Sequence, residues 1–380
     1  MRVTAWADRR SAPHDPRTAA FLGAALGVAF STCFLTGLYS HLAQHPPDWF
    51  TLPARPAGLY RVTQGLHVIS GIAAIPLLLA KLWAVFPHLV RWPPVRSIPH
   101  AIERLSLIPL VAGAVLQLWT GVANIDLWYP LPWFFPAGHY WLAWITIGAL
   151  VVHVGAKLTT TRAVLGRDGT AIADGHEPAT AGVDALARRR FLVWAGTASG
   201  VLTVATVGQT IAPLRNLALL APRRPDTGTD GFPVNGAAEE AHVVDGATAP
   251  DWHLEVVGAA APVRFTLAQL AAMPQREADL PIACVEGWSA QVRWRGVPLR
   301  SLLDAAGVGP DVSVTVHSIE TGLYAQSDVN AVQVADLDTL LALEANGAPL
   351  SLDHGYPVRL IGPNRPGVLQ TKWLRQVVVT

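Results

Sequence analysis

The chain has 380 residues, of which 51% are hydrophobic and only 14% charged. Ordinary globular domains carry about 25% charged residues, so this composition excludes a wholly soluble enzyme. The formal net charge of +1 gives no indication of a nucleic-acid partner. Almost all long hydrophobic runs lie within residues 19–213, whereas residues 223–380 have the composition of an ordinary polar domain. The two cysteines, Cys33 and Cys284, fall in these different regions, so we expect no disulfide between them.

Five segments are long and apolar enough to cross a bilayer, whose core of about 30 Å requires roughly 20 residues of helix. We predict an all-α domain of five transmembrane helices at about 19–42, 65–87, 105–125, 139–157 and 192–213. No secretory signal with a cleavage site precedes the first of them, so we expect the N-terminus to stay in the cytoplasm.

Basic residues gather in alternate connections between these helices. The third-to-fourth connection has no Lys or Arg and is aromatic, and the first-to-second has only Arg55 and Arg61. Cytoplasmic loops are enriched in Lys and Arg. We therefore expect a multi-pass protein of the cell membrane with an extracytoplasmic C-terminal domain. The basic residues of the other connections are Arg2, Arg9, Arg10, Arg17, Arg91, Arg96, Arg104, Lys157, Arg162, Arg167, Arg188, Arg189 and Arg190.

A run of three arginines, Arg188 to Arg190, stands directly before Phe191 and Leu192. This run resembles the twin-arginine export signal, which carries folded, cofactor-loaded domains across a membrane. The alternative is a simple cytoplasmic anchor for the fifth helix. Both interpretations stay open.

Histidines recur in the predicted membrane helices, where ionisable groups are costly and usually functional. His139 and His153 are 14 residues apart, which places them on roughly the same side of one helix, about 21 Å apart. That geometry suits two haems, one near each membrane face, each held by two imidazoles.

Ligand partners must match in depth. His67 and His139 both lie near the outer face and form the predicted outer pair, with His41 as the competing ligand. For an inner haem, His88 is the nearest partner of His153. The His67–His88 spacing is about 31 Å, against about 21 Å for the other helix, so the inner site is less well matched.

The helix count and histidine placement over residues 19–160 resemble the four-helix cytochrome b subunits of formate dehydrogenases and bacterial b561 proteins. This resemblance implies one or two haems b and electron exchange with a membrane quinone or quinol. In such families one inner ligand commonly lies near the start of the first helix. Residues 18–27 contain no histidine here, and only His14 is close.

The C-terminal region alternates short β-type runs with amphipathic stretches. We predict strands at 252–258, 312–317 and 356–362 and helices at 266–273, 297–306 and 333–343, which together indicate an α+β domain.

Two sequence blocks stand out in this region. The first contains Cys284, Glu286, Trp288, Ser289, Trp294, Gly296, Pro298 and Leu299, and the second, residues 354–374, contains His354, Arg359 and Lys372. These blocks resemble the molybdopterin-binding domain of the sulfite oxidase family, most closely its bacterial methionine-sulfoxide-reductase branch. The family pattern is a Cys ligand, Glu-x-Trp-Ser and then Trp-x-Gly-x-Pro-Leu, followed by a stretch in which His, Arg and Lys surround the pterin phosphate.

The resemblance implies roles that suit these side chains. A Cys284 thiolate is a soft ligand for molybdenum, and Arg359 and Lys372 supply positive charge for a phosphate. Glu286 is the candidate for proton transfer, with a structural hydrogen bond as the alternative, and Asn235 is expected over the cofactor. An anionic substrate has three further candidate ligands: Arg293, Arg295 and Arg365.

The sequence therefore predicts three parts: a cytochrome b-like membrane domain (1–165), a basic linker with the fifth helix (166–222), and an extracytoplasmic oxidoreductase domain (223–380). We expect reduction of an S-oxide or N-oxide, free or protein-bound as in methionine sulfoxide, with electrons from a quinol. The alternatives are sulfite oxidation in the reverse direction, a metal-free sensor or scaffold, and a cytochrome that serves another partner.

Overall fold

The computed structural model describes residues 12–89, 98–131, 135–165, 183–208 and 211–380. The described part of the chain divides into two compact units. The first unit is composed of Met1–Thr36, Leu66–Gly208 and Asn216–Leu220, and the second of Gly37–Gly65, Gln209–Arg215 and Ala221–Thr380.

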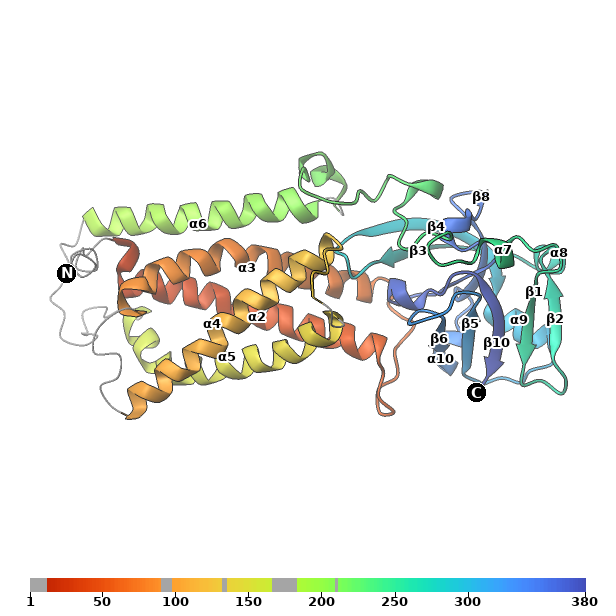
Figure 1. The fold of residues 1–380 in the computed structure, drawn as a ribbon, viewed down its shortest axis with the longest axis horizontal. Coiled ribbons are helices and arrows are strands. Elements are labelled where there is room, and N and C mark those ends of the chain that lie inside the picture. The colour runs from red at the N-terminus through yellow and green to blue at the C-terminus, as the bar shows by residue number, and fades with distance from the viewer. Residues whose placement is uncertain (1–11, 90–97, 132–134, 166–182, 209–210) are drawn as a thin grey trace. The chain divides into compact units, whose positions relative to one another are not determined.

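Five long helices dominate the N-terminal half of the chain (Figure 1): α2 (Pro16–Gln44), α3 (Leu59–Leu89), α4 (Ile98–Ile125), α5 (Phe135–Leu165) and α6 (Val183–Val207). Each contains a segment long and apolar enough to cross a membrane, with mean hydropathy between 1.3 and 2.0. The five predicted spans are confirmed as helices. The fifth ends at Val207 rather than 213, because Gly208 favours helix termination.

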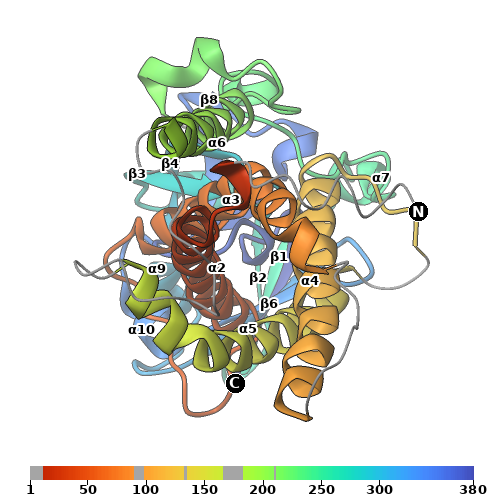
Figure 2. The ribbon, with the colours of Figure 1, turned by 90° about the vertical axis from the view of Figure 1, so that its left-hand side faces the viewer.

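Small side chains bring the helices of the first unit together. Ala29 of α2, Ala74 of α3 and Ala114 of α4 share one buried cluster, and Figure 2 shows α2 to α5 grouped around one another. Outward side chains are apolar and exposed, as at Trp141 (65%) and Trp194 (73%). Five such helices are consistent with a multi-pass membrane protein.

Two mixed sheets form most of the second unit. The first has the order β2-β1-β10-β5-β6, in which β1 and β10 are parallel, and the second has the order β3-β4-β7-β8 with β9 also paired to β7. The strands are β1 (His253–Val257), β2 (Val263–Thr266), β3 (Arg276–Ala283), β4 (Ser289–Pro298), β5 (Val314–Ser318), β6 (Gln326–Val329), β7 (Leu340–Ala345), β8 (Ala348–Pro349), β9 (Arg359–Ile361) and β10 (Leu374–Val379).

Short helices connect these strands: α7 (Val244–Ala247), α8 (Leu267–Ala272), α9 (Leu299–Ala305) and α10 (Ala331–Ala335). This confirms the predicted α+β class and the three predicted strands. The predicted helix at 333–343 is wrong beyond Ala335, where α10 ends, and β7 begins at Leu340. Leu340, Leu341 and Ala342 are fully buried, so burial within a sheet overrides their helix propensity.

Candidate active site

Cys284 lies in the tight turn that joins β3 to β4. Its backbone N–H donates to the Trp288 carbonyl (3.0 Å), and the Gly287 N–H donates to the Cys284 carbonyl (3.2 Å). Gly287 has a φ of 86°, a left-handed conformation that glycine adopts without steric cost. Since β3 and β4 pair along their whole length, the turn is held by a rigid hairpin.

The Cys284 side chain is only 2% exposed. Asn235 donates from Nδ2 to Cys284 Sγ at 3.1 Å. The predicted metal ligand, Cys284, and the predicted cofactor-binding residue Asn235 are therefore in direct contact. Burial, and next Glu286, raise the pKa of the Cys284 thiol to about 12. The thiol is therefore protonated at neutral pH, and a bound cation is required to stabilise the thiolate.

Glu286 is 4% exposed and forms two charge-assisted contacts. Trp288 Nε1 donates to Oε2 at 3.1 Å, and Arg223 Nη1 lies 2.9 Å from the same oxygen. Burial raises the pKa of Glu286, whereas Arg223 lowers it. Arg223 was not anticipated from the sequence, since its segment has no motif that links it to Cys284. Ser289, the first residue of β4, is also buried, and it pairs with Ala283 in the sheet.

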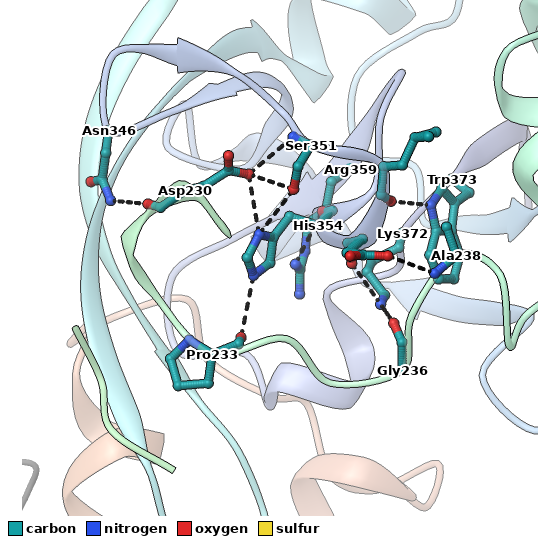
Figure 3. A network of polar contacts seen from close by, with 12 residues as sticks. Asp230, Pro233, Gly236, Ala238, Asn346, Ser351, His354, Arg359, Lys372 and Trp373 are labelled. Carbon is teal, nitrogen blue, oxygen red and sulfur yellow. Dashed lines mark hydrogen bonds and ion pairs between the residues drawn. The ribbon is translucent and has the colours of Figure 1, made fainter. Parts of the chain in front are cut away.

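His354 is at the centre of a polar network (Figure 3). It is 1% exposed, and its ring stacks on Phe232 with a centroid distance of 3.8 Å. Nε2 lies 3.2 Å from the Pro233 carbonyl, and Nδ1 lies 3.1 Å from the Asp230 carboxylate and 3.2 Å from Ser351 Oγ. Burial and the charge of Arg359 lower the pKa of His354 to about 4, so the ring is neutral at neutral pH.

Arg359 is a buried cation, 5% exposed, on β9. Its guanidinium donates to two carbonyl groups, those of His354 and Gln370, each at 3.2 Å. It also lies over the Trp294 ring, 5.7 Å from the centroid. Burial lowers the pKa of Arg359 to about 10, whereas Cys284 raises it, so the two assigned residues are within electrostatic range of each other.

Lys372 likewise donates to carbonyl groups. Its Nζ lies 2.8 Å from the carbonyl oxygen of Asn235 and 3.0 Å from that of Asp353. It also lies 2.5 Å from the carbonyl oxygen of Gly236 (Figure 3). Burial, and next Arg359, lower the pKa of Lys372 to about 7.

Arg359 and Lys372 fit a phosphate-bearing cofactor. Within the described residues, no carboxylate lies at ion-pair distance from Arg359, although buried cations normally have such a partner. Lys372 is partly buried, and Glu320, Asp353 and Glu240 act on it electrostatically. A dianionic phosphate would supply the missing charge, and Cys284 offers a soft donor for a transition metal nearby. The donor set is therefore suitable for a molybdenum–pterin group.

The three arginines considered for an anionic substrate already have polar partners. Arg293 lies 3.5 Å from Asp279, and Arg295 pairs with Glu344 at 2.5 Å. Arg365 is 2% exposed and donates to Gln333, Ser327 and nearby carbonyl groups. Tyr324, which the sequence analysis did not single out, is instead within electrostatic range of Cys284 and Glu286.

Two of the predicted haem ligands face each other in the first unit. His67 of α3 and His139 of α5 have ring centroids 6.2 Å apart. His67 Nδ1 lies 2.8 Å from the Cys33 carbonyl, and His139 Nδ1 lies 2.7 Å from Thr120 Oγ. In metal-bound histidines the second ring nitrogen is usually held in this way.

Three further residues were predicted as haem ligands: His41, His153 and His88. The competing ligand His41 lies beside His45, with ring centroids 5.0 Å apart. His153 lies on α5, and the side chain of His88, on α3, is outside the described residues. His14 Nδ1 lies 3.1 Å from the Ala84 carbonyl.

Comparison with known proteins gives one family match. Residues 241–380 match the model of the oxidoreductase molybdopterin binding domain. These residues include the β3–β4 turn with Cys284 and the whole second sequence block, but they exclude Arg223 and Asn235.

Three relatives illustrate the similarity. The inducible NADH nitrate reductase 2 of Glycine max is 33% identical over 162 residues, covering 34% of this chain and 18% of that protein. The mitochondrial sulfite oxidase of Drosophila melanogaster is 32% identical over 158 residues, covering 34% and 27%. The proposed protein-methionine-sulfoxide reductase subunit YedZ1 of Azospira oryzae is 31% identical over 165 residues, covering 42% and 61%. The chain thus spans between 18% and 61% of the length of these relatives.

Proposed function

We propose that the chain is a membrane-bound molybdenum oxidoreductase, because residues 241–380 match the model of the oxidoreductase molybdopterin binding domain. It transfers an oxygen atom at the Cys284 site and exchanges electrons with a membrane quinone through haem b. The observation that carries the proposal is the buried Cys284 thiol within electrostatic range of Arg359, a cation that has no carboxylate partner among the described residues.

The residues of the second unit have separate roles in this proposal. Cys284 binds molybdenum, Arg359 and Lys372 bind the pterin phosphate, and His354 and Asn235 contact the cofactor, which packs beside Trp288 and Ser289. The bound cofactor supplies the two-electron oxygen-transfer chemistry. Glu286, held by Trp288 and Arg223, is the group that we assign to proton transfer at the substrate oxygen.

The membrane helices supply the electrons. We assign His67 and His139 as axial ligands of an outer haem b, because their rings face each other and each Nδ1 already has an oxygen partner. A second haem at His153 is the further assignment, with His88 as its other ligand. The C-terminal domain then faces away from the cytoplasm, as the distribution of basic residues indicates.

The proposed substrate is a sulfoxide or N-oxide, with protein methionine sulfoxide as the leading candidate. The name of the relative YedZ1 supports this choice. Two electrons and two protons convert the S–O group into a thioether and one water molecule. The quinol that supplies both electrons becomes a quinone.

An oxidation screen tests the proposal. The purified holoprotein is reduced anaerobically, candidate oxides are added one at a time, and haem absorbance is recorded. We expect methionine sulfoxide or a related oxide to reoxidise the haems. A protein whose haems stay reduced with every oxide would be a cytochrome for another partner, and the proposal would fail.

The reverse arm of the same experiment tests sulfite oxidation, which similarity to a sulfite oxidase favours as the second candidate function. Sulfite is added to the oxidised protein. If sulfite reduces the haems and no oxide reoxidises them, the chain is a sulfite-oxidising enzyme and the proposed oxide reduction is wrong.

A further inference from the structure

The outer ends of α2 and α3, and the connection between them, form part of the second unit. That unit contains Gly37–Gly65 together with Ala221–Thr380. We define the α2–α3 connection as residues 45–58. Its Leu52 and Ala54 are 4% and 3% exposed, so these two residues are as buried as residues of a domain core.

Asn364 binds the connection at several points. Its Oδ1 accepts from the Tyr60 backbone N–H at 2.8 Å, and its Nδ2 donates to the Pro53 carbonyl at 2.7 Å and to the Tyr39 hydroxyl at 3.2 Å. Its own backbone N–H donates to the Ala57 carbonyl at 2.9 Å. The first N–H groups of a helix have no partner within the helix. Asn364 therefore caps α3 from a distant part of the sequence.

Further contacts fix the same connection. Arg55 donates to both carboxylate oxygens of Asp336, at 2.8 and 2.9 Å, and pairs with Asp338. Asn330 donates to the Leu52 carbonyl at 2.9 Å. These hydrogen bonds and ion pairs hold the connection in one orientation on the sheets.

Tyr60 lies at the centre of this contact. It is 1% exposed and belongs to a buried cluster with Ala283, the residue directly before Cys284. Its hydroxyl lies 3.0 Å from Ser40 Oγ, and Gln44 donates to it at 3.4 Å. Tyr60 also interacts electrostatically with Cys284. Its ring thus extends from the first turn of α3 to the neighbourhood of the metal ligand.

The same helix carries a proposed haem ligand. His67 follows Tyr60 by seven residues on α3, which is nearly two full turns and about 10 Å of rise. Both residues therefore lie on the same side of this helix.

We propose that Tyr60, held by Asn364, is the positioning residue through which electrons pass from the outer haem to the Cys284 site. This inference rests on the haem–molybdenum coupling proposed above. Electron tunnelling is faster through packed atoms than across a gap, and Tyr60 belongs to the same buried cluster as Ala283, the residue beside the proposed ligand. Tyr60 itself is not oxidised. Two electrons cross per turnover, and with two protons they convert the S–O group into a thioether and water.

The test compares two electron sources in the intact, membrane-derived holoprotein. In the first assay, pre-reduced haems are mixed with methionine sulfoxide and their reoxidation is timed. In the second, a reduced soluble viologen dye supplies electrons to the Cys284 site directly. The variants are Tyr60→Leu and Asn364→Ala, with Tyr129→Leu as the matched control on the α4–α5 connection, and haem and molybdenum contents are measured for each.

We expect Tyr60→Leu and Asn364→Ala to slow haem reoxidation by about tenfold to a hundredfold, the effect of a small displacement between reacting groups. Dye-driven turnover and both cofactor contents should stay at the wild-type level, and Tyr129→Leu should match the wild type in both assays. Tyr60→Phe, which keeps the aromatic ring, should retain fast reoxidation. The two variants change different residues. If one of them does not fold, the other still tests the inference.

Unchanged haem reoxidation in a folded variant would overturn the inference, as would an equal fall in both assays. A wild-type protein whose haems no oxide reoxidises would refute the proposed function instead. The two failures are therefore distinguishable.

Discussion

The side chains around Cys284 come from segments that are far apart in the sequence. Asn235 precedes the first strand, whereas Arg359 lies on β9, more than a hundred residues later. The Asn235 amide donates to Sγ, and Arg359 is within electrostatic range. The Asn235 amide and Arg223 lower the pKa of the Cys284 thiol, but burial raises it more strongly. We propose that a bound metal ion stabilises the thiolate.

Arg223 gives a prediction at the level of single residues. Arg223→Gln removes the ion-pair partner of a carboxylate whose side chain is 5% exposed. We expect the free energy of unfolding to fall by about 1–3 kcal/mol, because Glu286 is left buried with one partner fewer. Thermal denaturation of the purified protein measures this loss. Arg224→Gln, at the exposed neighbouring position, is the control, and equal stability of the two variants would contradict the account.

His354 gives a prediction for pH dependence. Its pKa is near 6.5 in an unfolded chain and about 4 in the folded one, so the unfolded state binds more protons between these pH values. Stability should therefore rise with pH from 4 to 6.5 and be lost on acidification across this window. The contribution of this group is about 3 kcal/mol. Denaturant titrations at several pH values check this prediction, and a His354→Gln variant with the wild-type slope would refute it.

At the level of elements, the β4–β7 pairing supports the Cys284 turn. The register of this pair shifts between Arg295 and Gly296. A Cβ at Gly296 would approach within 2.6 Å of Ala342 Cα and still closer to the Leu341 carbonyl. Only glycine permits this close approach of two backbones.

Gly296→Ala should consequently separate β4 from β7 and lower stability by about 1–3 kcal/mol. Thermal unfolding, together with the molybdenum content of the variant, measures the effect. Gly309→Ala is the control, because a Cβ there has nothing within 4 Å. If the Gly296→Ala protein is as stable as the control, the close approach of the β4 and β7 backbones does not contribute to stability.

Local sequence predicted some elements well and others poorly. The five membrane helices follow from apolar length alone, and Cys284 follows from a motif within 16 residues, 284–299. β7 was misread because its leucines suit a helix as well as a buried strand, and only pairing with β4 and β9 decides between them. Arg223, Tyr60 and Asn364 were missed because no spacing rule connects residues that meet only through tertiary structure.

Over the whole molecule, composition divides the chain into an apolar and a polar part, and the structure adds one exception. Gly37–Gly65 lies in the apolar half of the sequence, yet it belongs to the same compact unit as the sheets. A hydropathy pattern reports where a helix can cross a membrane, but it carries no information on where a connection docks. On the function proposed above, one chain would contain both an electron donor at His67 and His139 and an oxygen-transfer site at Cys284.

The most direct test of this account is the molybdenum content of the protein purified from cells that make the pterin cofactor. Elemental analysis should find about one molybdenum atom per chain in the wild type, since one thiolate binds one metal. The Cys284→Ser variant should be folded but should contain almost none. Wild-type protein devoid of molybdenum, or a Cys284→Ser variant with undiminished metal and oxide turnover, would contradict the account.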